Sequence, residues 1–296
     1  MTFAIITAVL FAFSAVFNTR ITKLLDEVTA NFYRLLAACI ILGAITLCFH
    51  PESFHPSASC WLMLSGVVGF GIGDIALFAA FARIGSRLTI LINFSLSAIV
   101  GAFADWFLLN DPIGIWQWTS IMVILCGLGL ALLSMGSGEM RKGSFRLGII
   151  AAAVAGIGQG IGATISRHAE AIAALSGITI NGISQAFQRV SAGLVCLFLL
   201  WLWKRRQGVL SQPGSKQNRV LTWVLLAALF GPVLGVSCFQ QSLKTMTSGE
   251  AMAVTATSPL LLIPLAYFFE GDRIRALSLL GAFVGVSGVI MMALLR

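Results

Sequence analysis

Apolar residues run along this chain in ten long segments, which are separated by short polar connections. Each segment approaches the roughly 17–25 residues that an α-helix needs to cross about 30 Å of hydrocarbon. None shows the strict alternation over about ten residues that marks a barrel strand. The pattern predicts an all-α integral membrane protein with ten transmembrane helices. The expected helices cover residues 3–19, 29–49, 59–82, 88–109, 115–135, 146–166, 183–203, 221–243, 250–269 and 276–295.

Two polar stretches are longer than the other connections: residues 136–146 and residues 204–219. Neither is long enough to form a soluble domain. Because the first lies near the middle of the chain, we interpret residues 138–146 as a linker. It separates two predicted five-helix halves, residues 1–137 and residues 147–296.

The two halves resemble each other in sequence, which indicates an internal duplication. Phe32-Tyr33-Arg34-Leu35 in the second span corresponds to Phe187-Gln188-Arg189-Val190 in the seventh. Because five spans is an odd number, the second half enters the membrane from the opposite side. The repeat is therefore expected to be inverted, which is typical of secondary transporters with a site near the midplane. A constant offset relates further pairs: Arg83 and Lys244, Leu96-Ser97-Ala98 and Thr257-Ser258-Pro259, Asp111 and Asp272, Gly127 and Gly288.

Several short motifs occur in the order and spacing of a known family. The loop Leu109-Asn110-Asp111-Pro112 has a counterpart in Glu270-Gly271-Asp272-Arg273, and each is followed by an apolar helix. Leu243-Lys244 and Ser258-Pro259-Leu260 precede the second loop. In these motifs the chain resembles the EamA-type members of the drug/metabolite transporter superfamily, and the resemblance covers essentially the whole chain.

The resemblance implies a helical bundle that moves small metabolites by alternating access. It does not imply a particular substrate, because the family is diverse. Two departures from the family pattern stand out. Ala98 stands where the first half would often have proline, and Asp111 and Asp272 replace the usual glutamate.

Composition fits a bilayer, with 58% hydrophobic and only 10% charged residues, whereas soluble proteins carry about 25% charged residues. The formal net charge of +8 does not indicate nucleic-acid binding, because the basic residues lie between apolar segments, where they orient helices. The expected partners are the lipid bilayer and a small-molecule metabolite, with no nucleic acid. The expected location is the cell (inner or plasma) membrane, with multiple passes. No pattern in the chain indicates an oligomeric state.

The distribution of the basic residues also predicts an orientation. Most of the 19 Lys and Arg residues lie in odd-numbered loops, and only Arg167, Lys244 and Arg296 lie on the other side. The positive-inside rule therefore places both termini outside the cell. The family resemblance implies the reverse, with both termini in the cytoplasm. Both orientations stay open at this point.

Asp74 is the sharpest functional candidate, because it lies inside the third span. It is about eight residues, or roughly 12 Å, from the end of that span. An aspartate cannot snorkel that far, so it needs a partner, a proton or a watery cavity. Asp74 is either a substrate-binding or coupling carboxylate, or a structural carboxylate. Arg34 lies on the same side of the membrane, where it can pair with Asp74 or snorkel to the interface.

The second half offers further candidates. Arg189, the repeat counterpart of Arg34, has Gln185, Gln188 and Gln240 within possible reach. An arginine fork suits a carboxylate or phosphate, so these residues favour an anionic or zwitterionic substrate. Gln159 lies near the midplane in a glycine-rich stretch that either leaves room for a ligand or allows close helix packing. Asn93, beside Phe94 in the fourth span, is a further candidate.

Other polar residues have simpler interpretations. Glu250 follows Thr247 by three positions, which predicts a capping box at the start of the ninth span. Asp105 lies near a span end beside Trp106, as expected at the membrane interface. Asp111 and Asp272 lie in short loops.

The leading interpretation is a secondary transporter of a small polar metabolite such as an amino acid, because the chain has no phosphate-binding loop for an ATPase. An intramembrane enzyme is the rival class. Gly285-Val286-Ser287-Gly288 resembles the nucleophile motif of rhomboid proteases, but no histidine follows it to act as a base. A non-transporting receptor or assembly subunit is the third class, and polar residues within spans argue against it. We expect no catalytic residue, no metal and no cofactor.

Overall fold

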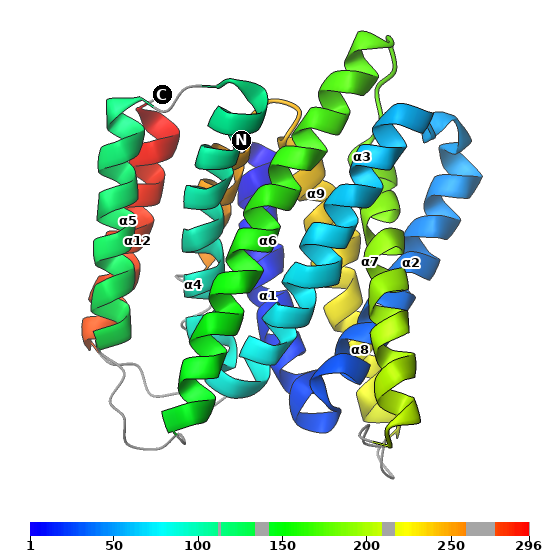
Figure 1. The fold of residues 1–296 in the computed structure, drawn as a ribbon, viewed down its shortest axis with the longest axis horizontal. Coiled ribbons are helices and arrows are strands. Elements are labelled where there is room, and N and C mark those ends of the chain that lie inside the picture. The colour runs from blue at the N-terminus through cyan, green and yellow to red at the C-terminus, as the bar shows by residue number, and fades with distance from the viewer. Residues whose placement is uncertain (112–113, 134–141, 209–216, 259–275, 296) are drawn as a thin grey trace.

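The computed structural model describes residues 1–111, 114–133, 142–208, 217–258 and 276–295. Within these ranges the chain is all-helical and contains no strand. Both chain ends lie at the upper end of the bundle in Figure 1. The elements are α1 (Thr2–Leu24), α2 (Glu27–Phe49), η1 (Pro51–Ser53), α3 (Pro56–Gly66), η2 (Val67–Gly73), α4 (Asp74–Leu109), α5 (Ile115–Leu133), α6 (Lys142–Leu175), α7 (Gly182–Arg206), α8 (Gln217–Ala228), η3 (Leu229–Val233), α9 (Leu234–Ser242), α10 (Ser248–Thr255) and α12 (Ala276–Leu294).

In the described part of the chain, seven helices are long and apolar enough to cross a membrane. The predicted third and fourth spans fall within one continuous stretch, Pro56–Leu109, and the fifth is a shorter apolar helix, Ile115–Leu130. Most of the predicted ninth span, 250–269, lies outside the described residues. The count of ten therefore stays a prediction, while the multi-pass helical character is clear.

Gly85 divides α4 into two arms. Its φ of 73° and ψ of 176° interrupt the helix, and a positive φ of this kind is open to glycine but strained for other residues. The chain turns back there, so that the second arm of α4 rises beside α6 in Figure 1. This reversal agrees with the predicted break between residues 82 and 88.

Two π-helical segments interrupt the bundle helices: η2, between α3 and α4, and η3, between α8 and α9. Pro232 lies inside η3, where its missing N–H removes a helical hydrogen bond. Such segments widen the backbone turn and are frequent at functional sites. The sequence pattern did not predict either of them.

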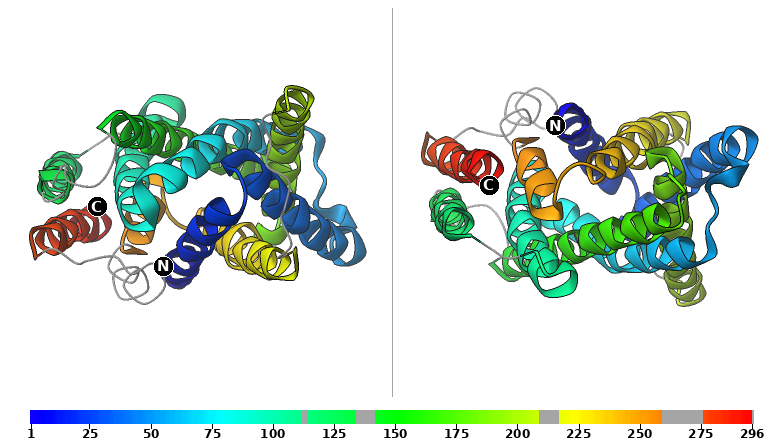
Figure 2. Two further views of the ribbon diagram at one scale, coloured as in Figure 1. Left: turned by 90° about the horizontal axis from the view of Figure 1, so that it is seen from below. Right: turned by 90° about the horizontal axis from the view of Figure 1, so that it is seen from above.

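Small residues bring the helices close together. A Cβ atom on Gly156 would lie 2.8 Å from the Asn93 carbonyl oxygen, and one on Gly160 would lie 2.8 Å from the Ser97 carbonyl oxygen. The glycine-rich stretch of α6 therefore packs directly on α4, as small residues do in membrane helices. α5 and α12 lie side by side at one edge of the bundle (Figure 2), and their backbones meet at Gly127 and Gly285.

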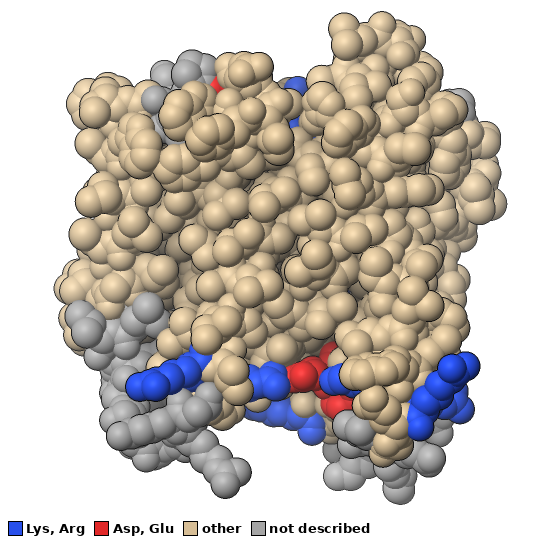
Figure 3. All heavy atoms as spheres, viewed as in Figure 1, with Lys and Arg blue, Asp and Glu red and all other residues tan. Residues whose placement is uncertain are grey.

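The outer surface suits a bilayer. On the face shown in Figure 3, a broad band without charged side chains separates the two ends of the bundle. Large apolar side chains such as Ile40, Phe49 and Phe107 point outward, as expected where lipid replaces water. Lys and Arg gather at the end opposite the chain termini. The positive-inside rule would place that end in the cytoplasm, so the conflict with the orientation implied by the family resemblance persists.

The predicted linker overlaps the start of a helix. α6 begins at Lys142 and continues to Leu175, whereas the polar pattern predicts a linker over 138–146 and a span over 146–166. The helix therefore includes residues 142–146, and it extends beyond the apolar segment that revealed it. Residues 138–141 lie outside the described part of the chain.

Candidate functional site

A buried ion pair lies where α2 meets the start of α4. The guanidinium of Arg34 bonds to the carboxylate of Asp74, and both residues are almost fully buried, at 3% and 2% exposure. The Asn31 side-chain oxygen accepts two further bonds from Arg34, at 3.1 and 3.3 Å. The ring of Phe78 lies 4.9 Å from the Arg34 guanidinium carbon. Arg34 thus pairs with Asp74 rather than snorkelling to the interface.

Gln159 joins this pair from α6. Its side-chain Nε2 donates to Asp74 Oδ1 at 3.2 Å and to the carbonyl oxygen of Gly69 at 3.3 Å. Gly69 belongs to η2, so the amide links the ion pair to the π-helical segment. Three of the predicted site residues, Asp74, Arg34 and Gln159, therefore form one hydrogen-bonded cluster.

Arg189 lies on α7 at 1% exposure. Its Nη1 donates to the Gln240 side-chain oxygen at 2.7 Å, and its guanidinium carbon lies 5.4 Å from the Phe70 ring centre. Among the described residues, its Nε and Nη2 atoms have no hydrogen-bond partner. Arg189 also interacts electrostatically with Asp74. The predicted contact with Gln240 is thus present, and Arg189 lies near the Asp74 cluster.

The other two glutamines serve different partners. Gln185 accepts a bond from Gln240 at 3.1 Å and donates to Glu170. Glu170 in turn lies 3.4 Å from the Lys244 ammonium. Gln188 donates to the Ser53 carbonyl oxygen at 3.2 Å. A chain of polar contacts therefore runs toward one end of the bundle, from Arg189 through Gln240, Gln185 and Glu170 to Lys244.

Each arginine packs against a π-helical segment of the opposite half of the chain. A Cβ atom on Gly69 in η2 would lie 2.9 Å from Arg189 Nη2, and one on Gly231 in η3 would lie 3.1 Å from Arg34 Nη1. Neither position leaves room for a side chain beside the guanidinium. The glycines therefore allow both arginines to lie directly on the backbone.

Among the described residues, no hydrogen bond joins the Asn93 side chain to Asp74 or to Arg189. Its side chain is buried, and its Oδ1 has no partner there. The neighbouring Phe94 stacks on Phe11 of α1, with ring centres 5.5 Å apart. The role of Asn93 as a site residue therefore stays a prediction.

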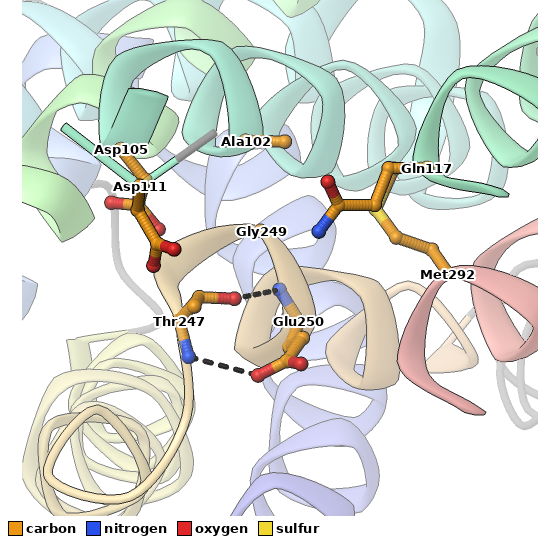
Figure 4. Close-up of a pocket in the computed structure, with 8 residues that line it drawn as sticks. All are labelled: Ala102, Asp105, Asp111, Gln117, Thr247, Gly249, Glu250 and Met292. Carbon is orange, nitrogen blue, oxygen red and sulfur yellow. Dashed lines mark hydrogen bonds between the residues drawn. The ribbon is translucent and has the colours of Figure 1, made fainter. Parts of the chain in front are cut away.

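A second polar group lies around a small pocket at the end of the bundle that carries the chain termini (Figure 4). Asp105 accepts from Thr164 at 2.9 Å and from the Ser248 backbone N–H at 2.7 Å. Arg167 lies 3.3 Å from Asp105 and 3.2 Å from Asp111. The sequence pattern predicts an interface position for Asp105, but this residue is 3% exposed and joins three elements.

The capping box at Glu250 is confirmed. Thr247 accepts from the Glu250 backbone N–H at 3.2 Å, and the Glu250 carboxylate accepts from the Thr247 backbone N–H at 3.0 Å. Figure 4 shows this reciprocal pair on the wall of the pocket. Within the described ranges, no group of three His, Cys, Asp or Glu residues is placed to hold a metal ion.

The Gly285-Val286-Ser287-Gly288 motif lies in a helix contact. A Cβ atom on Gly288 would lie 2.9 Å from the backbone nitrogen of Ile124 in α5. Ser287 donates to the Val284 carbonyl oxygen of its own helix at 2.8 Å. This geometry supports the packing interpretation of the motif.

Comparison with known proteins shows the family. A solved structure described as "Crystal structure of protein" aligns with a TM-score of 0.70 at 16% identity, covering 99% of this chain and 96% of that chain, so the two share a fold. No curated protein sequence matches. The model of the EamA-like transporter family matches two stretches, residues 1–133 and 146–294. The chain therefore belongs to the EamA-like transporter family.

Proposed function

We propose that this protein is a secondary transporter, an exporter or exchanger, of a small polar metabolite such as an amino acid or a related compound, in the cell (inner or plasma) membrane. The observation that carries the proposal is the buried polar cluster of Arg34, Asp74 and Gln159, with Arg189 close by. Charged groups inside a membrane bundle are costly and mark substrate or ion pathways. Membership of a transporter family supports the same conclusion.

The substrate site would lie between two inverted five-helix halves, residues 1–137 and 147–296. Two observations support this arrangement: the family model matches the chain twice, and Arg34 and Arg189 each lie against a glycine of the other half. A site built in this way changes shape when the halves move relative to each other. Alternating access of this kind is the usual mechanism of transporters with inverted repeats.

Ion pairs at the two ends of the bundle would act as gates. At one end Arg83 bonds to Glu27 at 2.7 Å, which joins α4 to α2. Toward the other end, Arg167 holds Asp105 and Asp111. Opening either end requires its own set of contacts to break while the other set holds.

Asp74 is our candidate for the coupling carboxylate. In the paired state its charge is matched by Arg34. In a proton-driven cycle, Asp74 would take up a proton when the pair separates, since an unpaired carboxylate is costly in this interior. The proton would then leave on the other side of the membrane when the pair forms again.

Transport assays on the purified protein in liposomes test this proposal. We expect flux of a small polar metabolite, and we expect Asp74→Asn to reduce it at least tenfold and to change its dependence on a pH gradient. Asp26→Asn is a matched control, because Asp26 caps α2 through its side-chain oxygen and asparagine caps equally well. Binding without any flux would favour a receptor or assembly subunit instead. Full activity with unchanged pH dependence in Asp74→Asn would remove Asp74 from the mechanism.

A further inference from the structure

Among the described residues, the buried side chains around Asp74 carry one more positive than negative charge. Five charged side chains are buried in the described part of the chain. Two of them, Asp105 and Glu250, lie around the pocket at the bundle end. The other three are Arg34, Asp74 and Arg189, so a single carboxylate faces two guanidinium groups.

The two guanidinium groups do not share this carboxylate equally. Asp74 is directly bonded to Arg34, and it acts on Arg189 only through longer-range attraction. The one side-chain bond that Arg189 makes in the described residues goes to the neutral amide of Gln240. Among the described residues, Arg189 therefore has no directly bonded counter-ion, and a buried charge in that state is strongly unfavourable.

The Nη2 donor of Arg189 lies near the cluster that Asp74 forms with Arg34 and Gln159. Nη2 is 2.9 Å and 3.3 Å from the points where Cβ atoms of Gly69 and Gly162 would lie. The side-chain oxygen of Gln159 lies 3.8 Å from the same Gly69 point, while its nitrogen holds Asp74. Nε and Nη2 form one edge of the guanidinium fork, and this edge matches the two oxygens of a carboxylate or phosphate.

We propose that Arg189 is the anion-binding residue of this transporter and that the metabolite it carries bears an oxyanion, either a carboxylate or a phosphate. The inference rests on the proposed function, because it assigns the substrate class of that same site. The bound anion supplies the negative charge that the buried side chains around Asp74 lack. Arg34 already has its carboxylate in Asp74, so it does not compete for the anion.

Thermal unfolding of the detergent-solubilised full chain gives a direct test, since a ligand that binds the folded state raises its stability. The probes are three pairs that differ by the anionic group: alanine and alaninamide, succinate and succinamide, glycerol 3-phosphate and glycerol. At matched ionic strength, we expect the anionic member of at least one pair to raise the unfolding midpoint and its partner to have no effect. A response to alanine or succinate would identify the oxyanion as a carboxylate, and a response to glycerol 3-phosphate would identify it as a phosphate.

Two variants connect the response to Arg189. Arg189→Gln removes the charge, and we expect it to weaken the binding of the anionic probe at least tenfold. Gly69→Ala keeps the charge but places a methyl group 2.9 Å from Nη2, and we expect it to weaken the response as well. Gly69→Ala therefore tests the site even if Arg189→Gln does not fold.

Matched controls lie away from the site. Arg205 is an exposed arginine on the same helix, against the Trp201 ring, and Arg205→Gln should leave the response unchanged. Among the described residues, no atom outside the local backbone of α5 lies within 4 Å of the Cβ position of Gly129, so Gly129→Ala is the control for Gly69→Ala.

The outcomes separate this inference from the proposed function. A wild-type chain that responds to none of the three anions, an equal response to both members of every pair, or an unchanged response in Arg189→Gln overturns the inference. Flux of a neutral metabolite in liposomes that does not depend on Arg189 would also overturn it, while the transporter function would stand. Anion binding that depends on Arg189 but is never accompanied by flux would support the inference and contradict the proposed function.

Discussion

The two buried arginines pack in the same way, but they bond to different partners. Arg34 and Arg189 each lie over an aromatic ring and against a glycine of a π-helical segment. Arg34 bonds to the carboxylate of Asp74, whereas Arg189 bonds to the amide of Gln240. Equivalent packing in the two halves therefore coexists with unequal electrostatics.

If Arg189 binds the anion as we propose, this difference divides two tasks between the two arginines. A guanidinium with its own carboxylate is satisfied in the absence of ligand, so it can hold helices together. A guanidinium with only an amide partner keeps N–H donors that can bind and release an anionic ligand. Three predictions test this division, in order of decreasing effect.

The largest effect is expected when the Arg34–Asp74 pair loses one member. Removal of one partner from a buried ion pair costs about 3–5 kcal/mol, because the other charge is left unpaired. Arg34→Met and Asp74→Leu should each destabilise the protein by that amount, and the double variant should be more stable than either. A double-mutant cycle of unfolding in detergent measures the coupling. If the two single costs simply add, the pair contributes nothing and the comparison of the two arginines fails.

A smaller effect is expected when Arg189 receives a carboxylate of its own. Gln240→Glu would make the second half resemble the first, because Gln240 is the direct partner of Arg189. We expect the unfolding midpoint to stay the same or rise, and anion binding to fall at least tenfold, or about 1.4 kcal/mol. Titration of the anionic probe into the variant and the wild type measures this. Equal binding by both proteins would show that Arg189 is not the anion site.

The sequence predicted the members of the central cluster better than their connections. The depth of Asp74, Arg34 and Gln159 in their spans follows from counting residues at 1.5 Å each. The cost of an isolated charge at that depth then implies a partner, a proton or a watery cavity. The structure shows a partner, because Arg34 and Gln159 both bond to Asp74.

What the sequence missed depends on how helices face one another. Asp105 lies within the last turns of α4, and its place near a span end beside Trp106 suggested an interface position. Its partners Thr164 and Ser248 are 59 and 143 residues away, and no local pattern reveals such contacts. The π-helical segments were missed for a related reason, since a shift of backbone hydrogen bonds leaves the apolar pattern unchanged.

The smallest effect is expected at the Arg83–Glu27 pair, which makes a control for the first prediction. Its side chains are 30% and 25% exposed, so water screens the charges and both remain partly solvated when separated. Exposed ion pairs contribute about 0.2–1 kcal/mol, and Glu27→Gln should cost no more than this in unfolding experiments. If the pair acts as a gate, the same variant should change the rate of flux while stability hardly moves. A stability loss as large as that of Asp74→Leu would mean that burial does not set the difference between the two pairs.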